Sequence, residues 1–262
     1  MAVAETFSEL LALEPHGPDV YVGISAHYPW SRVYGGQVMA QGLWAASRTV
    51  DEQHRVHSVH AYFIRGGQAD EPIRFEVDRI RNGRSFLTRR VVARQSSGAI
   101  LNLAASFQLH EEAIDVQSVA IPAPVPSPED TTADAWSAIL DRRPIADPDQ
   151  ASTRAWLRIA EPLADDPIVH ACGLAFTSDD IPMDAITRSH PGERGEKGVF
   201  MGASLDHTIW FHRPGRADEW QLHDVRSHGL TAARGLVIGN VFSVDGTHIA
   251  TLAQEGLLRV RR

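Results

Sequence analysis

The sequence predicts an α+β fold built from two tandem repeats, each of them a helix followed by an antiparallel sheet. Three observations lead to this prediction. Runs rich in β-branched and aromatic residues follow one another with short turns between them. A stretch of good helix formers, opened by two glycines, precedes these runs. The same pattern then recurs in the second half of the chain at a constant spacing.

The first repeat begins with the helix candidate GGQVMAQGLWAASRTV, residues 35–50. Apolar side chains occupy most of its faces, which predicts a helix that is largely buried. Four strand candidates follow, and Gly-containing turns such as QSSG separate several of them. This order favours a helix wrapped by a curved antiparallel sheet. The strand candidates are residues 57–65, 72–83, 85–98 and 100–108.

The second repeat emerges when the sequence is shifted by 148 positions without gaps. Phe63 then falls on Phe211, Gly98 on Gly246, and FIRGGQADEP on FHRPGRADEW. The turn QSSG is replaced by SVDG at the same place. A register that holds over about forty residues indicates a duplicated fold unit.

A segment rich in Pro, Asp and Glu separates the two repeats, from Leu109 to about Ser152. Prolines at this density exclude a central strand and break helices. We predict a linker with at most one short helix, near Ala133 to Leu140. The predicted division is an N-terminal repeat over residues 1–112, a linker over 113–152 and a C-terminal repeat over 153–262.

The composition argues against several classes of function. The chain has 262 residues, of which 43% are hydrophobic and 22% charged, as in a globular protein. Its formal net charge of −8 argues against nucleic-acid binding. A single cysteine, Cys172, leaves no internal disulfide and argues against a cysteine-based zinc site.

No apolar stretch approaches the roughly 20 residues of a membrane helix. Residues 1–15 lack the basic start of a signal peptide and read as a short amphipathic helix. We therefore predict a cytoplasmic protein without membrane insertion.

The stretch ASLDHTIWFHRP places Ser204, Asp206 and His207 close together, as in a hydrolase triad. On a continuous strand, however, Ser204 and Asp206 point to one face and His207 to the other. The serine also lacks the G-x-S-x-G turn of α/β-hydrolases. We predict that Asp206, His207 and His212 are structural and that Ser204 alone is functional.

Five motifs, in order along the chain, resemble the acyl-CoA thioesterase II family, the double-hotdog thioesterases. They are VYGGQVMAQGL, HSVHAYFIR, NGRSFLTRRV, LDHTIWFHRP and LAQEG. The resemblance covers nearly the whole chain and implies a double hotdog, in which the two repeats form one continuous sheet. It implies hydrolysis of fatty acyl-CoA to free fatty acid and CoA, with no metal and no organic cofactor. A homo-oligomer is also expected, because hotdog sheets have edges that tend to pair.

The same resemblance implies a catalytic set of Asp179, Ser204 and Gln254. Asp179 lies in the run GLAFTSDD, Ser204 stands two residues before the Asp-His pair, and Gln254 precedes Glu-Gly in the last strand candidate. Asp179 would activate a water alone, or orient it together with Ser204 and Gln254, beside a helix N-terminus that receives the thioester carbonyl. This chain departs from the family in carrying a second acid, Asp180, which could shift the pKa of Asp179 or take over its role.

Four residues are predicted to bind substrate. Basic groups in an acidic protein can receive the phosphates of CoA. Arg84 and Ser85 lie in the turn NGRS, Arg89 lies in the strand after it, and Gly36 lies in the glycine pair that opens the helix. Solvated strand ends and an ordinary turn are the alternative interpretation of the basic segment.

Only the second repeat is predicted to hold a working site. The shift of 148 carries the three catalytic candidates back to Ser106, Val56 and Ser31, so the first repeat lacks the acid. Gln108, at the end of a first-repeat strand, is interpreted as an ordinary strand-end residue. The first repeat would then supply part of an apolar wall for the acyl chain.

Two other functions remain open from the sequence. A hotdog hydratase or dehydratase that acts on enoyl-CoA needs an Asp-His pair, and here no histidine follows Asp179 and Asp180 before His190. A non-catalytic acyl-CoA-binding protein could keep the same fold. The presence of all three catalytic residue types argues against that second alternative.

Overall fold

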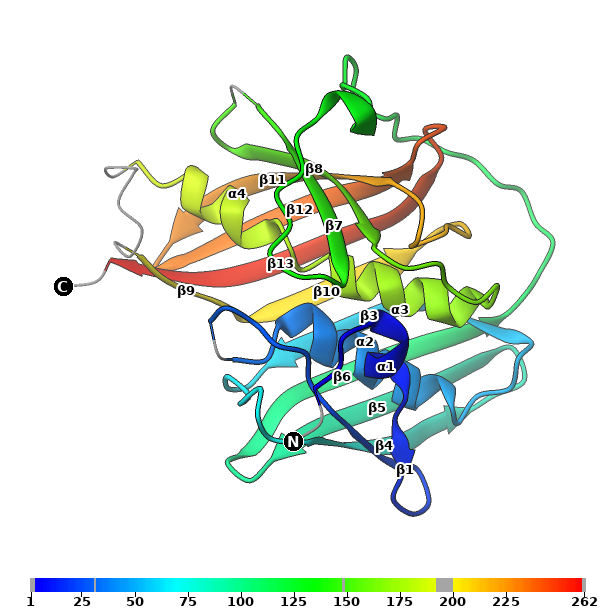
Figure 1. Cartoon of the computed structure of the whole chain (residues 1–262). Helices are drawn as coiled ribbons and strands as arrows, with labels where there is room; N and C mark the ends of the chain where they lie inside the picture. The colour runs from blue at the N-terminus through cyan, green and yellow to red at the C-terminus, as the bar shows by residue number, and fades with distance from the viewer. Residues whose placement is uncertain (1–2, 31, 148, 192–199, 261–262) are drawn as a thin grey trace.

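Each half of the chain places helices before an antiparallel run of strands, as the sequence predicts (Figure 1). The structure is a computed structural model that describes residues 3–30, 32–147, 149–191 and 200–260. The elements of the first half are α1 (Phe7–Leu11), β1 (Glu14–Pro15), β2 (Val20–Gly23), α2 (Gly35–Ser47), β3 (His54–Phe63), β4 (Ile73–Asn82), β5 (Phe86–Gln95) and β6 (Gly98–Leu109). Those that follow are η1 (Pro128–Asp130), β7 (Leu140–Ile145), β8 (Ser152–Ile159), α3 (Pro167–Thr177), α4 (Pro182–Arg188), β9 (Phe200–Ser204), β10 (Asp206–Phe211), β11 (Gln221–Thr231), β12 (Arg234–Ser243) and β13 (His248–Val260).

One antiparallel sheet runs through both halves. Within the described residues it has 13 strands in the order β1-β2-β4-β5-β6-β3-β10-β13-β12-β11-β8-β7, and β9 pairs with β13 beside this path. The halves join at the middle of the sheet, where β3 pairs with β10 and Val59 lies opposite Ile209. This arrangement confirms the predicted α+β class and the double hotdog with a continuous sheet.

Helix α2 is buried on nearly all sides, between β4, β5 and β6 and the helix α3 (Figure 1). Its two buried glutamines are fully engaged. The Gln37 amide nitrogen donates to Ser25 Oγ and to Gln41 Oε1, at 3.0 Å each. The Gln41 amide nitrogen donates to the backbone carbonyls of Leu10 and Ile24, at 2.9 Å each. These hydrogen bonds allow two polar side chains on one face of a buried helix without unpaired amide nitrogens.

The duplication is visible in the element boundaries. Strands β5 and β12 are related at both ends by the shift of 148 residues. Gly98 and Gly246 both adopt positive φ angles, 110° and 88°, where the hairpins enter the last strand of each half. Helix α4 begins at Pro182, one residue before the position to which the shift carries Gly35. Before β3 the shift fails: it carries β2 onto residues 168–171, inside α3, although β8 is the strand that pairs with β11 as β2 pairs with β4.

The proline-rich segment departs from the sequence prediction. The stretch from Ala133 to Leu140, for which we predict at most one short helix, holds none: a 3₁₀ turn, η1, lies before it, and strand β7 begins at Leu140. Strand β7 pairs with β8 alone at the end of the sheet and tolerates Pro144, because an edge strand needs no partner on its outer side. The rest of the segment runs along the outside of the molecule from one half to the other (Figure 1). The boundaries at residues 112 and 152 remain our proposal.

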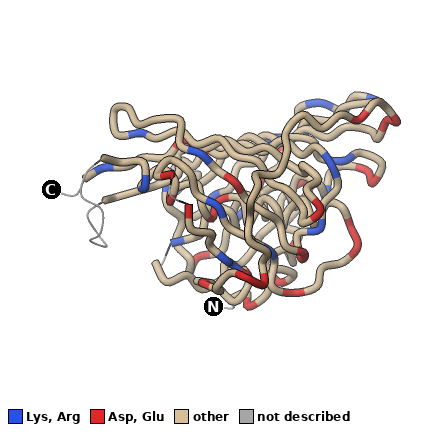
Figure 2. The backbone as a smooth tube through the Cα atoms, turned by 90° about the horizontal axis from the view of Figure 1, so that it is seen from above, with Lys and Arg blue, Asp and Glu red and all other residues tan. Residues whose placement is uncertain are grey.

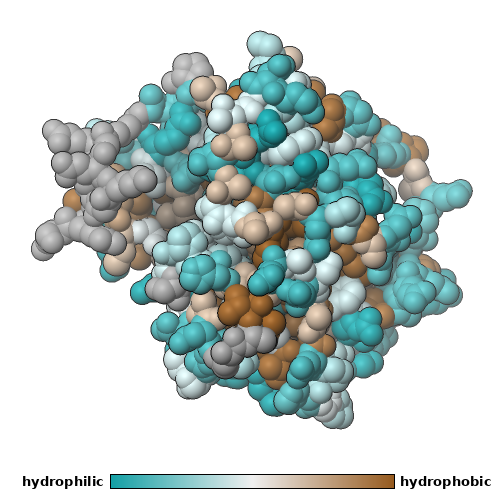
Figure 3. Space-filling model, in the orientation of Figure 1, coloured by the Kyte–Doolittle hydropathy of each residue, from teal (hydrophilic) through white to brown (hydrophobic). Residues whose placement is uncertain are grey.

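Charged residues of both signs are spread along the chain (Figure 2), and the face drawn in Figure 3 is mostly hydrophilic. Acidic and basic positions are interspersed along the backbone (Figure 2). The face drawn in Figure 3 is largely hydrophilic, with apolar atoms exposed in smaller groups. None of the helices in the described part of the chain has the length and apolar character that crossing a membrane requires.

Candidate active site

Asp179 lies where the end of α3 meets the start of α2. It follows the C-cap residue of α3, and only 7% of its surface is exposed. The backbone N–H of Gly36, in the first turn of α2, donates a hydrogen bond to its carboxyl group. A side chain at Gly35 would overlap Asp179 Oδ2, so the carboxyl group fills the space that this glycine leaves. An acid from the second half therefore faces the N-terminus of a helix from the first.

The glycine pair lets the two helices approach each other this closely. A Cβ atom at Gly36 would overlap the backbone carbonyl oxygen of Phe176, near the end of α3. The Tyr34 hydroxyl donates to that same carbonyl at 2.9 Å, and its ring packs edge-on against Phe176. Tyr34 is the N-cap residue of α2 but makes no side-chain capping bond, which leaves the first-turn N–H groups for other acceptors. Gly36, predicted to bind substrate, thus lies at the site as a close-packed donor to Asp179.

Ser204 and Gln254 reach the same carboxyl group from the sheet. The Ser204 hydroxyl donates to Asp179 Oδ1 at 3.3 Å, and the Gln254 amide nitrogen donates to Ser204 Oγ at 2.8 Å. Pairing of β9 with β13, in which Ser204 lies opposite Gly256, brings these two side chains together. The structure therefore places the three predicted catalytic residues in direct contact, although they are far apart in sequence.

Burial controls the ionisation of Asp179. Its removal from water raises the pKa of the carboxyl group from 3.8 to about 7. Hydrogen bonds from Ser204, Gln254 and the Gly36 backbone act in the opposite direction, and the nearby charge of Asp180 raises the pKa further. A carboxyl group with a pKa near neutrality can accept a proton and release it again at the same pH.

Asp180 points into a different set of partners. The Trp136 indole N–H donates to its Oδ1 at 2.6 Å, and Arg142 Nε donates to its Oδ2 at 2.7 Å. The same guanidinium also binds Asp134 and Asp184, at 2.8 and 2.9 Å. Burial raises the pKa of Asp180, and the charge of Arg142 opposes that rise. Both oxygens of Asp180 thus bind Trp136 and Arg142, whereas Oδ1 of Asp179 accepts from Ser204 and its Oδ2 lies beside Gly35.

His207 contacts Gln254, and the sequence does not predict this contact. It is fully buried on β10, with Nδ1 against Gln254 Oε1 and Nε2 2.9 Å from Ser178 Oγ. Ser204 and His207 are therefore joined through Gln254, as expected for residues that do not form a direct pair. The sequence prediction places Ser204 and His207 on opposite faces of one strand. In the structure they lie on different strands, because Leu205 separates β9 from β10.

The basic residues predicted to bind CoA do not converge on this site. Arg89 is 1% exposed and donates to Thr49 Oγ1 at 2.6 Å and to the Thr49 and Arg81 carbonyls at 2.9 Å. Its guanidinium is enclosed and already paired, which argues against the predicted contact with substrate.

The turn that holds Arg84 and Ser85 lies at the far end of β3 from the site. The Arg84 carbonyl is 3.1 Å from Nε2 of His54, the first residue of β3. Phe63, the last residue of β3, is the one beside Gly35. Ten residues of strand separate these ends by about 30 Å. The structure does not bring Arg84 and Ser85 to Asp179.

The first-half counterparts form a different group. Ser106, the counterpart of Gln254, has its Oγ 2.8 Å from His57 Nε2. Val56, the counterpart of Ser204, offers no hydroxyl group, and neither residue supplies an acid. Ser31, the counterpart of Asp179, lies outside the described residues. Gln108 sits in the sheet opposite Arg55 and Phe86. That only one site works therefore stays a prediction.

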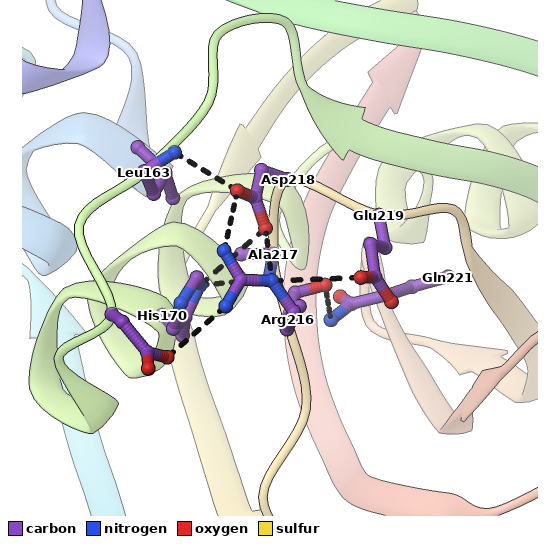
Figure 4. Close-up of polar contacts among 8 residues, drawn as sticks. Leu163, His170, Arg216, Ala217, Asp218, Glu219 and Gln221 are labelled. Atoms are coloured by element: carbon purple, nitrogen blue, oxygen red, sulfur yellow. Dashed lines mark hydrogen bonds and ion pairs between the residues drawn. The ribbon is translucent and has the colours of Figure 1, made fainter.

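A second polar cluster lies at the start of α3, at the opposite end of this helix from Asp179 (Figure 4). Arg216 donates to both oxygens of Asp218, at 3.1 and 2.9 Å. Asp218 also accepts from the Leu163 backbone, and His170 Nδ1 accepts from the Ala217 backbone. These contacts tie the loop after β10 to α3, which favours a structural role. Among the described residues, no group of three or more His, Cys, Asp or Glu side chains could hold a metal ion.

Comparison with known proteins identifies the family of this chain. The family model for acyl-CoA thioesterase matches residues 136–257, and that for the acyl-CoA thioesterase N-terminal domain matches residues 26–108. Acyl-coenzyme A thioesterase 8 of Mus musculus is 33% identical over 97% of this chain and 89% of its own length. Acyl-CoA thioesterase 2 of Haemophilus influenzae is 34% identical over 95% of this chain and 96% of its own. The crystal structure of the acyl-CoA thioesterase II TesB2 from Mycobacterium marinum is 38% identical and superposes with a TM-score of 0.86, covering 98% of this chain and 99% of that one. The chain therefore belongs to the acyl-CoA thioesterase family and is a thioester hydrolase.

The contact between Gly35 and Asp179 predicts that Gly35→Ala displaces the carboxyl group. Misplacement of a reacting group by about 1 Å can cost about 10²-fold in rate, and we expect a loss of that order in kcat. Gly42→Ala in the same helix is the matched control, because its new Cβ would meet only ordinary contacts at 3.5 Å. It should keep full activity and gain up to about 1 kcal/mol in stability. Equal kcat values for the two variants would contradict the close packing described here.

The raised pKa of Asp179 predicts how Asp179→Asn changes stability with pH. The unfolded chain ionises this acid near 3.8 and the folded protein near 7, so ionisation disfavours folding as pH rises. The Asn variant should be as stable as the wild type below about pH 4. Its free energy of unfolding should exceed that of the wild type by a growing amount between pH 4 and 7, and the difference should be constant above pH 7. Three pKa units correspond to roughly 4 kcal/mol at most. Urea unfolding at several pH values measures the difference, and an advantage that shrinks with rising pH would contradict the assigned shift.

Proposed function

We propose that this protein hydrolyses fatty acyl-CoA thioesters to free fatty acid and CoA, with water activated at Asp179, Ser204 and Gln254. One observation carries the proposal: a buried carboxyl group with a pKa near 7 contacts a hydroxyl group, an amide and the N-terminus of a long helix. The names of the relatives, which are acyl-CoA thioesterases, support acyl-CoA as the substrate.

Asp179 would act as the general base. As the water oxygen attacks the thioester carbon, a proton passes from the water to Asp179. The C–S bond then breaks, and the CoA thiolate takes up that proton to give the free thiol and the free acid. A thiolate is a good leaving group, so the site needs little beyond a base and a means of stabilising the negative charge on the carbonyl oxygen.

Ser204 and Gln254 would hold the attacking water. The Gln254 amide nitrogen has two N–H groups, one of which faces Ser204, and the Ser204 hydroxyl can exchange between Asp179 and a water. The first turn of α2 would stabilise the charge on the thioester oxygen, because its N–H groups carry the positive end of the helix dipole. Gly36 already gives its N–H to Asp179, so the neighbouring first-turn N–H groups are the candidate donors to substrate.

The alternatives fit the site less well. Hydration of an enoyl-CoA needs a histidine that reaches the substrate, but His207 is fully buried against Gln254 and Ser178. His190 packs against the ring of Phe200. A mere binding protein would gain nothing from burying Asp179, since a strongly shifted acid in a protein interior is typical of catalysis. The cytoplasmic location and the homo-oligomeric state stay predictions.

Release of CoA thiol from a series of acyl-CoA substrates tests the proposal. Asp179→Asn should lower kcat by about 10²–10⁴-fold, because it removes the base. Asp180→Asn should lower it far less, since Asp180 faces Arg142 and Trp136. An inactive Asp180→Asn beside a nearly normal Asp179→Asn would exchange the two roles. Hydration of an enoyl-CoA without thiol release from any acyl-CoA would overturn the proposed reaction.

Variants of the first half test whether a single site works. Gln254→Ala should lower kcat by about 10²–10³-fold, as for the loss of one oriented donor. Ser106→Ala and Gln108→Ala are the matched changes in the other repeat and should leave kcat unchanged. A comparable loss from either of them would indicate two working sites in each chain.

A further inference from the structure

The amide of Gln254 has two ends with different tasks. Its nitrogen faces Ser204 Oγ at 2.8 Å and lowers the pKa of Asp179 through a hydrogen bond. Its oxygen faces His207 Nδ1. If the amide turned by half a rotation, the oxygen would face the Asp179 carboxylate, and two acceptors would repel each other. Something must therefore hold the amide in one orientation.

His207 can supply that constraint only in one tautomer. Burial lowers the pKa of its imidazole to about 4, so the ring is neutral near pH 7 and has a single N–H. For Gln254 Oε1 to receive a hydrogen bond, this N–H must be at Nδ1. Nε2 is then an acceptor, and in this tautomer the single hydroxyl proton of Ser178 goes to Nε2, 2.9 Å away, instead of to the Ala175 carbonyl at 3.1 Å.

We propose that His207 is a positioning residue for catalysis: its Nδ1–H holds the Gln254 amide so that the amide nitrogen faces Ser204 and Asp179. This inference rests on the proposed role of Gln254. It completes a chain in which every donor has an acceptor. Ser178 donates to His207, His207 to Gln254, Gln254 to Ser204, and Ser204 to Asp179.

Three substitutions separate this role from mere packing. In His207→Asn, the amide nitrogen can occupy the place of Nδ1 and still donate to Gln254. In His207→Gln, the amide reaches the place of Nε2 instead, and in His207→Leu both hydrogen bonds are lost. We expect His207→Asn to keep most of the wild-type kcat, and the other two to lose about 10²-fold with little change in KM. A lower kcat for His207→Asn than for His207→Gln would overturn the inference.

His223 provides the matched control. It is also fully buried, burial and the nearby His207 lower its pKa to about 3, and its Nε2 lies 3.5 Å from Thr177 Oγ1. His223→Leu should reduce the melting temperature about as much as His207→Leu but leave kcat near that of the wild type. An equal loss of kcat in both variants would mean that His207 acts only through packing.

A double variant shows whether His207 acts through Gln254. Once Gln254→Ala has removed the amide, His207→Leu should cause no further loss of kcat, whereas independent effects would multiply. Multiplication would refute the inference. Normal kcat in Gln254→Ala alone would instead refute the proposed role of Gln254, so the two failures are distinguishable. Loss in Gln254→Ala with none in His207→Leu would refute only the positioning role.

Discussion

The close approach of α3 to the start of α2 is the constraint on which the rest of the site depends. Two consecutive glycines make it sterically possible, because side chains at Gly35 and Gly36 would overlap Asp179 and the Phe176 carbonyl. The hydrogen bond from Tyr34 to Phe176 then ties the helices together. The same contact removes Asp179 from water and places it against helix N–H groups. Burial and hydrogen bonding therefore act on the acid in opposite directions, and burial prevails.

The continuous sheet explains how such a site can span a duplicated chain. Pairing of β3 with β10 fixes the two halves in one register, so α2 of the first half meets residues of the second. Strands β9 and β13 then deliver Ser204 and Gln254 to the acid. His207 lies on β10, the strand that pairs with the first half, and its Nδ1 contacts the Gln254 amide oxygen. Parts of both repeats thus enter one site, while the acid, hydroxyl and amide come from the second alone.

Much of this fold could be predicted from the sequence, because the repeat of strands and turns is local and periodic. Strand β7 was missed because its proline argues against a strand, except at a sheet edge that only the full topology reveals. The burial of Arg89 had a signal in the alternation of β5, where Leu87, Arg89 and Val91 share one inward face. The contact of His207 with Gln254 depends on strand pairing and helix packing together, and no spacing in a single sequence encodes it.

The ionisation of Asp179 is the property that decides between a buried base and an ordinary surface acid. Carboxyl carbons of labelled aspartate can be followed by NMR through a pH titration, and the Asp179 signal is the one absent from Asp179→Asn. A midpoint near pH 7, far above the usual 3.8, is the expected result. A midpoint near 4 would contradict the account, because burial would then not prevail over the hydrogen bonds to Asp179 and the carboxylate would be a weaker base at neutral pH.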